Sequence, residues 1–164
     1  MPLETLPAAV DNVLKGAGHP TASLQIALDT IASEFEARTA TLHFADLRGR
    51  MLHMVAQRGI PEHIAAITRD IPFGKGMAGI CAERLAPVEV CNVQTDASGQ
   101  SRPGAKETGV AGASVVPVMA SGQLVGTLGI GKSEEHEYSE PERKTLEECA
   151  AKLAHALGQL RFDK

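Results

Sequence analysis

Residues 113–131, ASVVPVMASGQLVGTLGIG, form two β-rich apolar runs on either side of Ser121-Gly122-Gln123. A short connector that contains glycine, placed between two such runs, predicts an antiparallel hairpin. From Thr108 to Gly131 the chain has no charged residue over 24 positions, which is long enough for a membrane span. Pro117 and six glycines interrupt this stretch, so we predict a hairpin of strands and no membrane span.

Apolar runs outside this hairpin predict the rest of an antiparallel sheet. Thr39–Leu47 and Met51–Arg58 flank Arg48-Gly49-Arg50 and form a second predicted hairpin. Pro87–Val93 is a single predicted strand, whose first position tolerates a proline because no donor is needed there. We therefore expect about five or six strands. The polar run Gln94–Gly109 is expected to be a functional lid or a locally disordered loop.

Helical periodicity marks both ends of the chain. Apolar residues recur at helical spacing within residues 3–14 and 24–35, and a third stripe with a/d-like spacing runs through residues 146–160. Ser139-Glu140-Pro141-Glu142 has the pattern of a capping box at the start of this last helix. Shorter helices are predicted at about 61–67 and 77–85. These elements predict an α+β fold, with the terminal helices on one face of the sheet.

Composition limits the classes of function. The 164 residues include 16 Lys+Arg and 20 Asp+Glu, a net charge of −4, which predicts one domain and argues against the basic face that nucleic-acid binding needs. Cys81, Cys91 and Cys149 show no CxxC spacing and are typical of free thiols in a reducing compartment. The first residues lack the basic and apolar segments of a secretory signal. We predict a cytoplasmic protein with no nucleic-acid or membrane partner.

Several short segments of the sequence, taken in their order along the chain, resemble those of a GAF domain. They are residues 71–79 (IPFGKGMAG), 87–93 (PVEVCNV), 114–118 (SVVPV) and 124–130 (LVGTLGI), followed by a closing helix at 138–160. The resemblance runs from about Pro20 to Leu160. It implies a six-stranded antiparallel sheet with a small-molecule pocket on the face opposite the terminal helices, under short helices and a loop. Accordingly we divide the chain into an N-terminal helical extension, 1–18, and a GAF-like domain, 19–162.

We predict that a small molecule binds beneath the Gln94–Gly109 loop, beside the glycine-shaped helix start at Gly74–Gly79. Gly74, Gly76 and Gly79 match a dinucleotide fingerprint, but no buried parallel strand precedes them, so we interpret them as shaping a tight turn into a helix. Backbone N–H groups at such a helix start favour an anionic group. The predicted pocket walls are Phe73, Met77, Ile80, Cys81 and Val93, and the side chains expected to meet an anion are Lys75, Arg102 and Lys106.

One enzyme class resembles the chain in size and motif order. Free methionine-R-sulfoxide reductases are single-domain GAF enzymes in which one thiolate attacks the sulfoxide and a second thiol resolves the intermediate. Here Ala78 stands at the cysteine of their glycine-flanked turn, Thr68 stands at the cysteine ten residues upstream, and Gln94–Gly109 contains no cysteine. We therefore predict a non-catalytic domain. A thiol-dependent enzyme acting through Cys81 or Cys91 is the alternative.

Other ligands of GAF domains lose support for similar reasons. The cyclic-nucleotide signature begins with Asn-Lys, whereas Asn12 and Asn92 both precede valine, and no cysteine precedes a histidine as bilin attachment typically requires. None of the six histidines forms an HxxxH or CxxCH pattern, so we predict no metal and no cofactor. His43 and His53 lie on neighbouring predicted strands and either can enter the pocket, although a satisfied or exposed histidine is the expectation.

These observations predict a sensory domain that binds an unidentified small molecule and signals through a homodimer of its terminal helices. The a/d-like spacing of the last helix suits such a helical seam. A sensor kinase or another output domain is the kind of partner that such a domain serves. The alternative is a ligand-free dimerisation or protein-interaction module.

Overall fold

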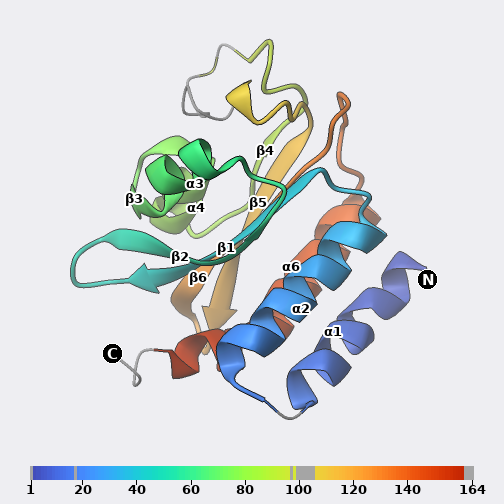
Figure 1. Cartoon of the computed structure of the whole chain (residues 1–164), viewed down its shortest axis with the longest axis vertical. Coiled ribbons are helices and arrows are strands. Elements are labelled where there is room, and N and C mark those ends of the chain that lie inside the picture. Colours follow the sequence, from blue (N-terminus) through green and yellow to red (C-terminus); the bar gives the residue numbers. More distant parts are fainter. Residues whose placement is uncertain (1, 17, 97, 99–105, 161–164) are drawn as a thin grey trace.

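A six-stranded antiparallel sheet forms the centre of the protein in a computed structural model, which describes residues 2–16, 18–96, 98 and 106–160 (Figure 1). The spatial order of the strands is β3-β2-β1-β6-β5-β4, and every neighbouring pair is antiparallel. The predicted α+β class and both predicted hairpins are confirmed. The strands are β1 (Thr39–Asp46), β2 (Met51–Arg58), β3 (Asp70–Pro72), β4 (Val88–Val90), β5 (Ala113–Ala120) and β6 (Gln123–Gly131).

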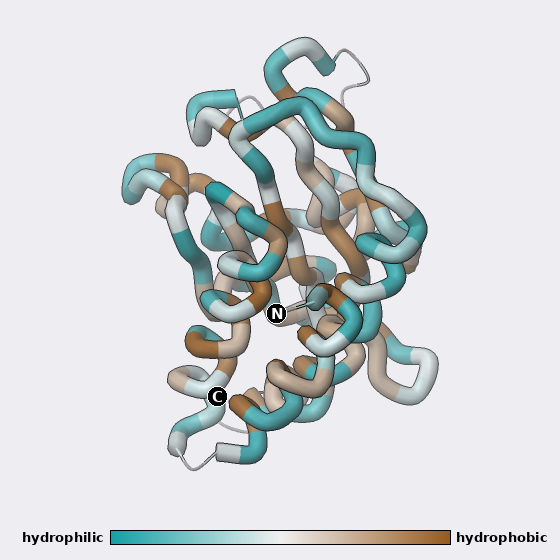
Figure 2. Tube along the Cα trace, turned by 90° about the vertical axis from the view of Figure 1, so that its right-hand side faces the viewer, coloured by the Kyte–Doolittle hydropathy of each residue, from teal (hydrophilic) through white to brown (hydrophobic). Residues whose placement is uncertain are grey.

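Three helices form a layer over one face of this sheet, the first of them packed mainly on the other two (Figure 1). They are α1 (Leu6–Lys15), α2 (Pro20–Glu34) and α6 (Glu140–Gln159), and a short 3-10 turn, η1 (Leu3–Thr5), precedes α1. Ala40, Leu42 and Phe44 alternate along β1 and join the core beneath the helices, because successive side chains of a strand point to opposite faces. Hydrophobic stretches accordingly lie along the strands in Figure 2, and hydrophilic ones along the connecting turns. Leu6 and Val10 of α1 are buried in this same core.

The last helix begins at the predicted capping box. Ser139 Oγ accepts a hydrogen bond from the Glu142 N–H at 3.2 Å, and Glu142 Oε1 accepts one from the Ser139 N–H at 2.9 Å. Leu146 and Leu153, two residues of the apolar stripe, are fully buried in the chain's own core. In the described part of the helical layer, Ile26 is the one large apolar side chain that is exposed. A homodimer through these helices stays a prediction.

The opposite face of the sheet carries two short helices, α3 (Glu62–Thr68) and α4 (Gly76–Arg84) (Figure 1). Periodicity did not predict β3 between them, because this edge strand has three residues and buries one side chain, Ile71. Strand β4 is shorter than the predicted 87–93. Residues 97 and 99–105 of the predicted loop lie outside the described residues. No helix among the described residues is long and apolar enough to cross a membrane.

Candidate functional site

A cavity of about 150 Å³ lies between the sheet and the two short helices. Its lining combines apolar side chains from α3, α4 and the loops with small polar side chains from β1. The lining residues are Thr39, Thr41, His43, Ile60, Ile64, Thr68, Ile71, Lys75, Gly76, Met77, Ala78, Thr108 and Val110. An apolar cavity of about this volume holds a benzene-sized molecule in a well-studied engineered protein. The size and walls therefore suit a compact, largely apolar ligand.

Glycines of β6 keep the floor of this cavity open. Thr41 lies opposite Gly129 and Thr39 lies opposite Gly131 in the pairing of β1 with β6. A Cβ atom at Gly129 would lie 3.0 Å from Thr41 Oγ1, and one at Gly131 would lie 2.7 Å from Thr39 Oγ1. The missing side chains thus leave room for the threonine hydroxyl groups on the floor. A larger residue at either glycine would crowd the cavity.

His43 is the most deeply buried polar side chain of the described cavity lining. Its exposed fraction is 2%, and its Nε2 lies 2.9 Å from the carbonyl oxygen of Thr68 at the end of α3. A carbonyl oxygen only accepts hydrogen bonds, so Nε2 donates this one and carries a proton. Burial lowers the pKa of His43, which keeps the ring neutral near pH 7. Its second nitrogen, Nδ1, is buried and has no hydrogen-bond partner among the described residues.

The glycine-shaped turn positions α4 at one wall. Gly74 adopts a φ of +87°, which L-residues with a side chain rarely adopt. At Gly79 a Cβ atom would lie 2.5 Å from the carbonyl oxygen of Pro72, so only glycine allows this close approach of helix to strand. Because β3 is an antiparallel edge strand, these glycines serve the turn, as the sequence predicted. Lys75, at the N-cap, is exposed at the rim beside the helix N-terminus.

Side-chain hydrogen bonds hold the far end of the long loop against the cavity. Arg38 Nε donates to the carbonyl oxygen of Thr108 at 3.0 Å. Gln94 Nε2 donates to the carbonyl oxygens of Lys106 at 2.9 Å and Val110 at 2.8 Å. Thr108 and Val110 both line the cavity, so these bonds fix that part of its wall.

Two of the predicted pocket residues, Lys75 and Met77, line the cavity. Val93 is buried beside Met77 in a neighbouring apolar cluster, and Cys81 and Ile80 pack toward Val88 and Val115, on the side of α4 that covers β5.

The remaining predicted site residues lie elsewhere. Phe73 belongs to a third cluster, where the guanidinium carbon of Arg50 lies 5.2 Å from its ring centre. Lys106 is exposed and is absent from the described lining. Arg102 lies outside the described residues. Of the predicted anion-binding side chains, Lys75 is therefore the one that the described lining includes.

The sequence prediction left β1 out of the site, although it noted that His43 can enter the pocket. Thr39, Thr41 and His43 alternate with apolar residues, a pattern that usually indicates a solvated face of a strand. Here that face is covered by α3 and α4, and its polar groups line the cavity. His43 had been expected to be satisfied or exposed. It is buried, and one of its two ring nitrogens has a hydrogen-bond partner among the described residues.

None of the described lining residues is a cysteine. Thr68 and Ala78, the positions that match motif cysteines of the sulfoxide reductases, both face the cavity without sulfur. Burial raises the pKa of Cys81 to about 12, which leaves its thiol protonated and unreactive near pH 7. Cys91 is exposed on the chain after β4. The described residues contain no cluster of three or more His, Cys, Asp or Glu that could hold a metal ion.

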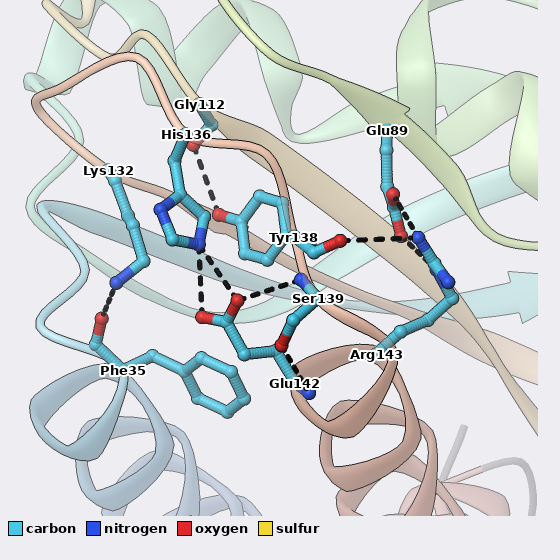
Figure 3. Close-up of polar contacts among 9 residues, drawn as sticks. All are labelled: Phe35, Glu89, Gly112, Lys132, His136, Tyr138, Ser139, Glu142 and Arg143. Carbon is cyan, nitrogen blue, oxygen red and sulfur yellow. Dashed lines mark hydrogen bonds and ion pairs between the residues drawn. The ribbon is translucent and has the colours of Figure 1, made fainter.

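A polar cluster ties the edge of the sheet to the start of α6 (Figure 3). Arg143 of α6 forms a two-pronged ion pair with Glu89 of β4, with N–O distances of 2.5 and 2.9 Å. Nearby, His136 Nε2 lies 3.0 Å from both carboxylate oxygens of Glu142. Burial alone would raise the pKa of Glu142, but the Ser139 N–H and His136 lower it overall. The cluster connects the edge strand β4 to the helical layer through side chains.

Comparisons with known proteins identify the fold. A family model described as a GAF domain matches residues 19–158. Among curated proteins no sequence matches the chain. The solved GAF domain of a phosphoenolpyruvate-protein phosphotransferase from Coxiella burnetii is similar at 20% identity and a TM-score of 0.83, over 98% of this chain and 95% of that one. The free methionine-R-sulfoxide reductase of Neisseria meningitidis, solved with its substrate, is similar at 18% identity and a TM-score of 0.79, over 99% of this chain and 92% of its own.

Proposed function

The chain belongs to the GAF domain family, and on that premise we propose that it is a regulatory domain that binds a small molecule in the cavity between its sheet and α3 and α4. One observation carries the proposal: the cavity is walled by apolar side chains yet contains a buried polar group, His43, with an unpartnered atom. Ligand sites combine apolar walls with a few placed polar groups in this way.

A binding role is favoured over catalysis by the chemistry of the lining. A thiol-dependent reaction of the reductase type needs a thiolate at the bound substrate. The described lining offers threonine, histidine and lysine in place of cysteine, and the buried thiol of Cys81 is held protonated. The reductase from Neisseria meningitidis, which was solved with its substrate, has the same fold, whereas the described lining of this chain lacks the thiol that such a reaction needs.

We also propose a route by which ligand binding changes the position of the helical layer. Strand β4 lies at the sheet edge beside α4, and its Glu89 pairs with Arg143 near the start of α6. A ligand that shifts α4 would displace this edge strand and, with it, the start of α6. The terminal helices then pass the change to a second copy of the chain or to an output domain, the partners that we propose.

Filling the cavity tests the binding role. Ala78→Leu places a larger side chain in the lining, and Ala66→Leu on the exposed side of α3 is the matched control. A set of small fragments is titrated into ¹⁵N-labelled protein, and backbone shifts of the lining residues are followed. We expect saturable shifts in the wild type and in Ala66→Leu, and none in Ala78→Leu. Absence of saturable shifts in the wild-type lining, or equal binding by Ala78→Leu, would contradict the proposal.

A further inference from the structure

The two ring nitrogens of His43 have different partners. Nε2 donates to the carbonyl oxygen of Thr68, which fixes the tautomer of the neutral ring. Nδ1 is then a bare lone pair that can only accept a hydrogen bond. Since buried polar atoms in folded proteins are nearly always paired, an unpartnered acceptor in a side chain that is 2% exposed calls for a partner from outside the described residues. Nδ1 is itself closed to solvent in this structure, so a donor reaches it only when a neighbouring side chain moves aside, as side chains commonly do on binding.

The surroundings of His43 restrict that partner. Ile64, Ile71 and Met77 supply apolar walls, which disfavour a charged group inside the cavity. Lys75 carries the one charge of the described lining, and it is positive. The nearby N-terminus of α4 adds a partial positive charge of the same sign. An ammonium ligand would meet repulsion at the rim and desolvation within, so the donor that reaches Nδ1 belongs to an uncharged group.

From these contacts we infer that the cavity selects a compact molecule with an apolar body and one uncharged O–H or N–H group, which donates a hydrogen bond to Nδ1 of His43. This inference rests on the proposed function, because it names the class of ligand for the same cavity. The volume of about 150 Å³ limits the body to about the size of a single six-membered ring. Phenols, small cyclic alcohols and azoles belong to this class.

Comparing the binding of phenol with that of toluene tests the hydrogen-bond donor apart from the apolar ring, because the two molecules differ mainly by a hydroxyl in place of a methyl group. Each is titrated into the full chain, and dissociation constants are taken from backbone shifts of the lining residues. The ¹⁵N resonance of His43 Nδ1 is followed in the same samples. We expect phenol to bind more tightly than toluene, and we expect phenol alone to move the Nδ1 resonance to lower shift, as a lone pair does when it accepts a hydrogen bond.

Variants of the histidine supply the second arm of the test. His43→Leu removes the acceptor, and we expect the preference for phenol over toluene to fall by about tenfold, the size of one hydrogen bond. His43→Asn can offer its amide oxygen close to the place of Nδ1, and we expect it to keep part of the preference. His53→Leu is the matched control on the neighbouring strand, outside the described lining, and we expect no change.

The outcomes separate the two proposals. Toluene binding in the cavity without a preference for phenol, and with Nδ1 unmoved, would overturn the inference while the proposed function stands, since it would mean that the bound ligand does not reach Nδ1. Failure of both probes to bind the wild type at millimolar concentration would contradict the proposed function and the inference together. Because the wild-type comparison needs no variant, a folding defect in His43→Leu does not weaken either result.

Discussion

Replacing Ile64 by alanine removes three carbon atoms from a side chain of α3 that is 1% exposed and lines the cavity between α3 and the sheet. At about 0.8 kcal/mol for each buried carbon, the lost transfer free energy is about 2.4 kcal/mol. The space that remains joins the existing cavity, so the additional cost of a new void is small. We therefore expect Ile64→Ala to lower the free energy of unfolding by about 2–3 kcal/mol.

Urea unfolding followed by far-UV circular dichroism measures this loss, since the chain has no tryptophan to report by fluorescence. Ile67→Ala is the matched control: it is the same substitution on the same helix, at a side chain that is 54% exposed, and we expect a loss below about 0.5 kcal/mol. Equal losses for the two variants would refute the packing of α3 on the sheet, and with it the cavity. A change in the slope of the unfolding free energy against urea concentration would show instead that the denatured state had changed.

Three further predictions concern single groups. Tyr138→Phe removes a buried hydrogen bond of 3.1 Å from the Tyr138 hydroxyl to the carbonyl oxygen of Gly112, and that oxygen still accepts a bond from the Lys132 N–H. Urea unfolding should show that the free energy of unfolding falls by about 0.5–1.5 kcal/mol, and an unchanged value would contradict the Tyr138 bond. Burial lowers the pKa of His43, so as the pH falls the unfolded chain binds a proton at this histidine before the folded chain does. The stability that the neutral, buried His43 contributes is therefore present above about pH 6.5 and is lost as the pH falls. His43→Gln should flatten the stability–pH curve below that pH, and an unchanged slope would show that the group is solvated. In native protein a thiol reagent should label Cys91 alone, with the two buried cysteines reacting only on unfolding, as intact mass spectrometry would show; early labelling of a second thiol would contradict their burial.

Local chemistry made much of the fold predictable. Ser139 and Glu142 have the side chains and the spacing of a capping box, and both hydrogen bonds form. The turn at Ser121-Gly122 divides two long apolar runs, and the hairpin β5–β6 results. Strand β3 could not be predicted in the same way. Its pairing with β2 depends on tertiary placement, and three residues are too few to show a periodicity.

The cavity was less predictable than the fold because it depends on which face each element presents. The glycines at the start of α4 lie beside the cavity, but the apolar residues that follow them lie on two sides of the helix. Met77 lines the cavity, whereas Cys81 packs toward β5. The polar alternation of Thr41 and His43 in β1 indicates a solvated strand face until the covering helices are known. A polar strand face beneath short helices is the signal that would have found His43.

A crystal structure determined under xenon pressure tests the central claim, a ligand-sized cavity between the sheet and the short helices, most directly. Xenon enters apolar cavities of this size and needs no hydrogen bond, so its binding is independent of the role inferred for His43. We expect xenon in contact with Ile64, Ile71 and Met77. A structure in which these side chains close upon one another, with no xenon between them, would contradict it.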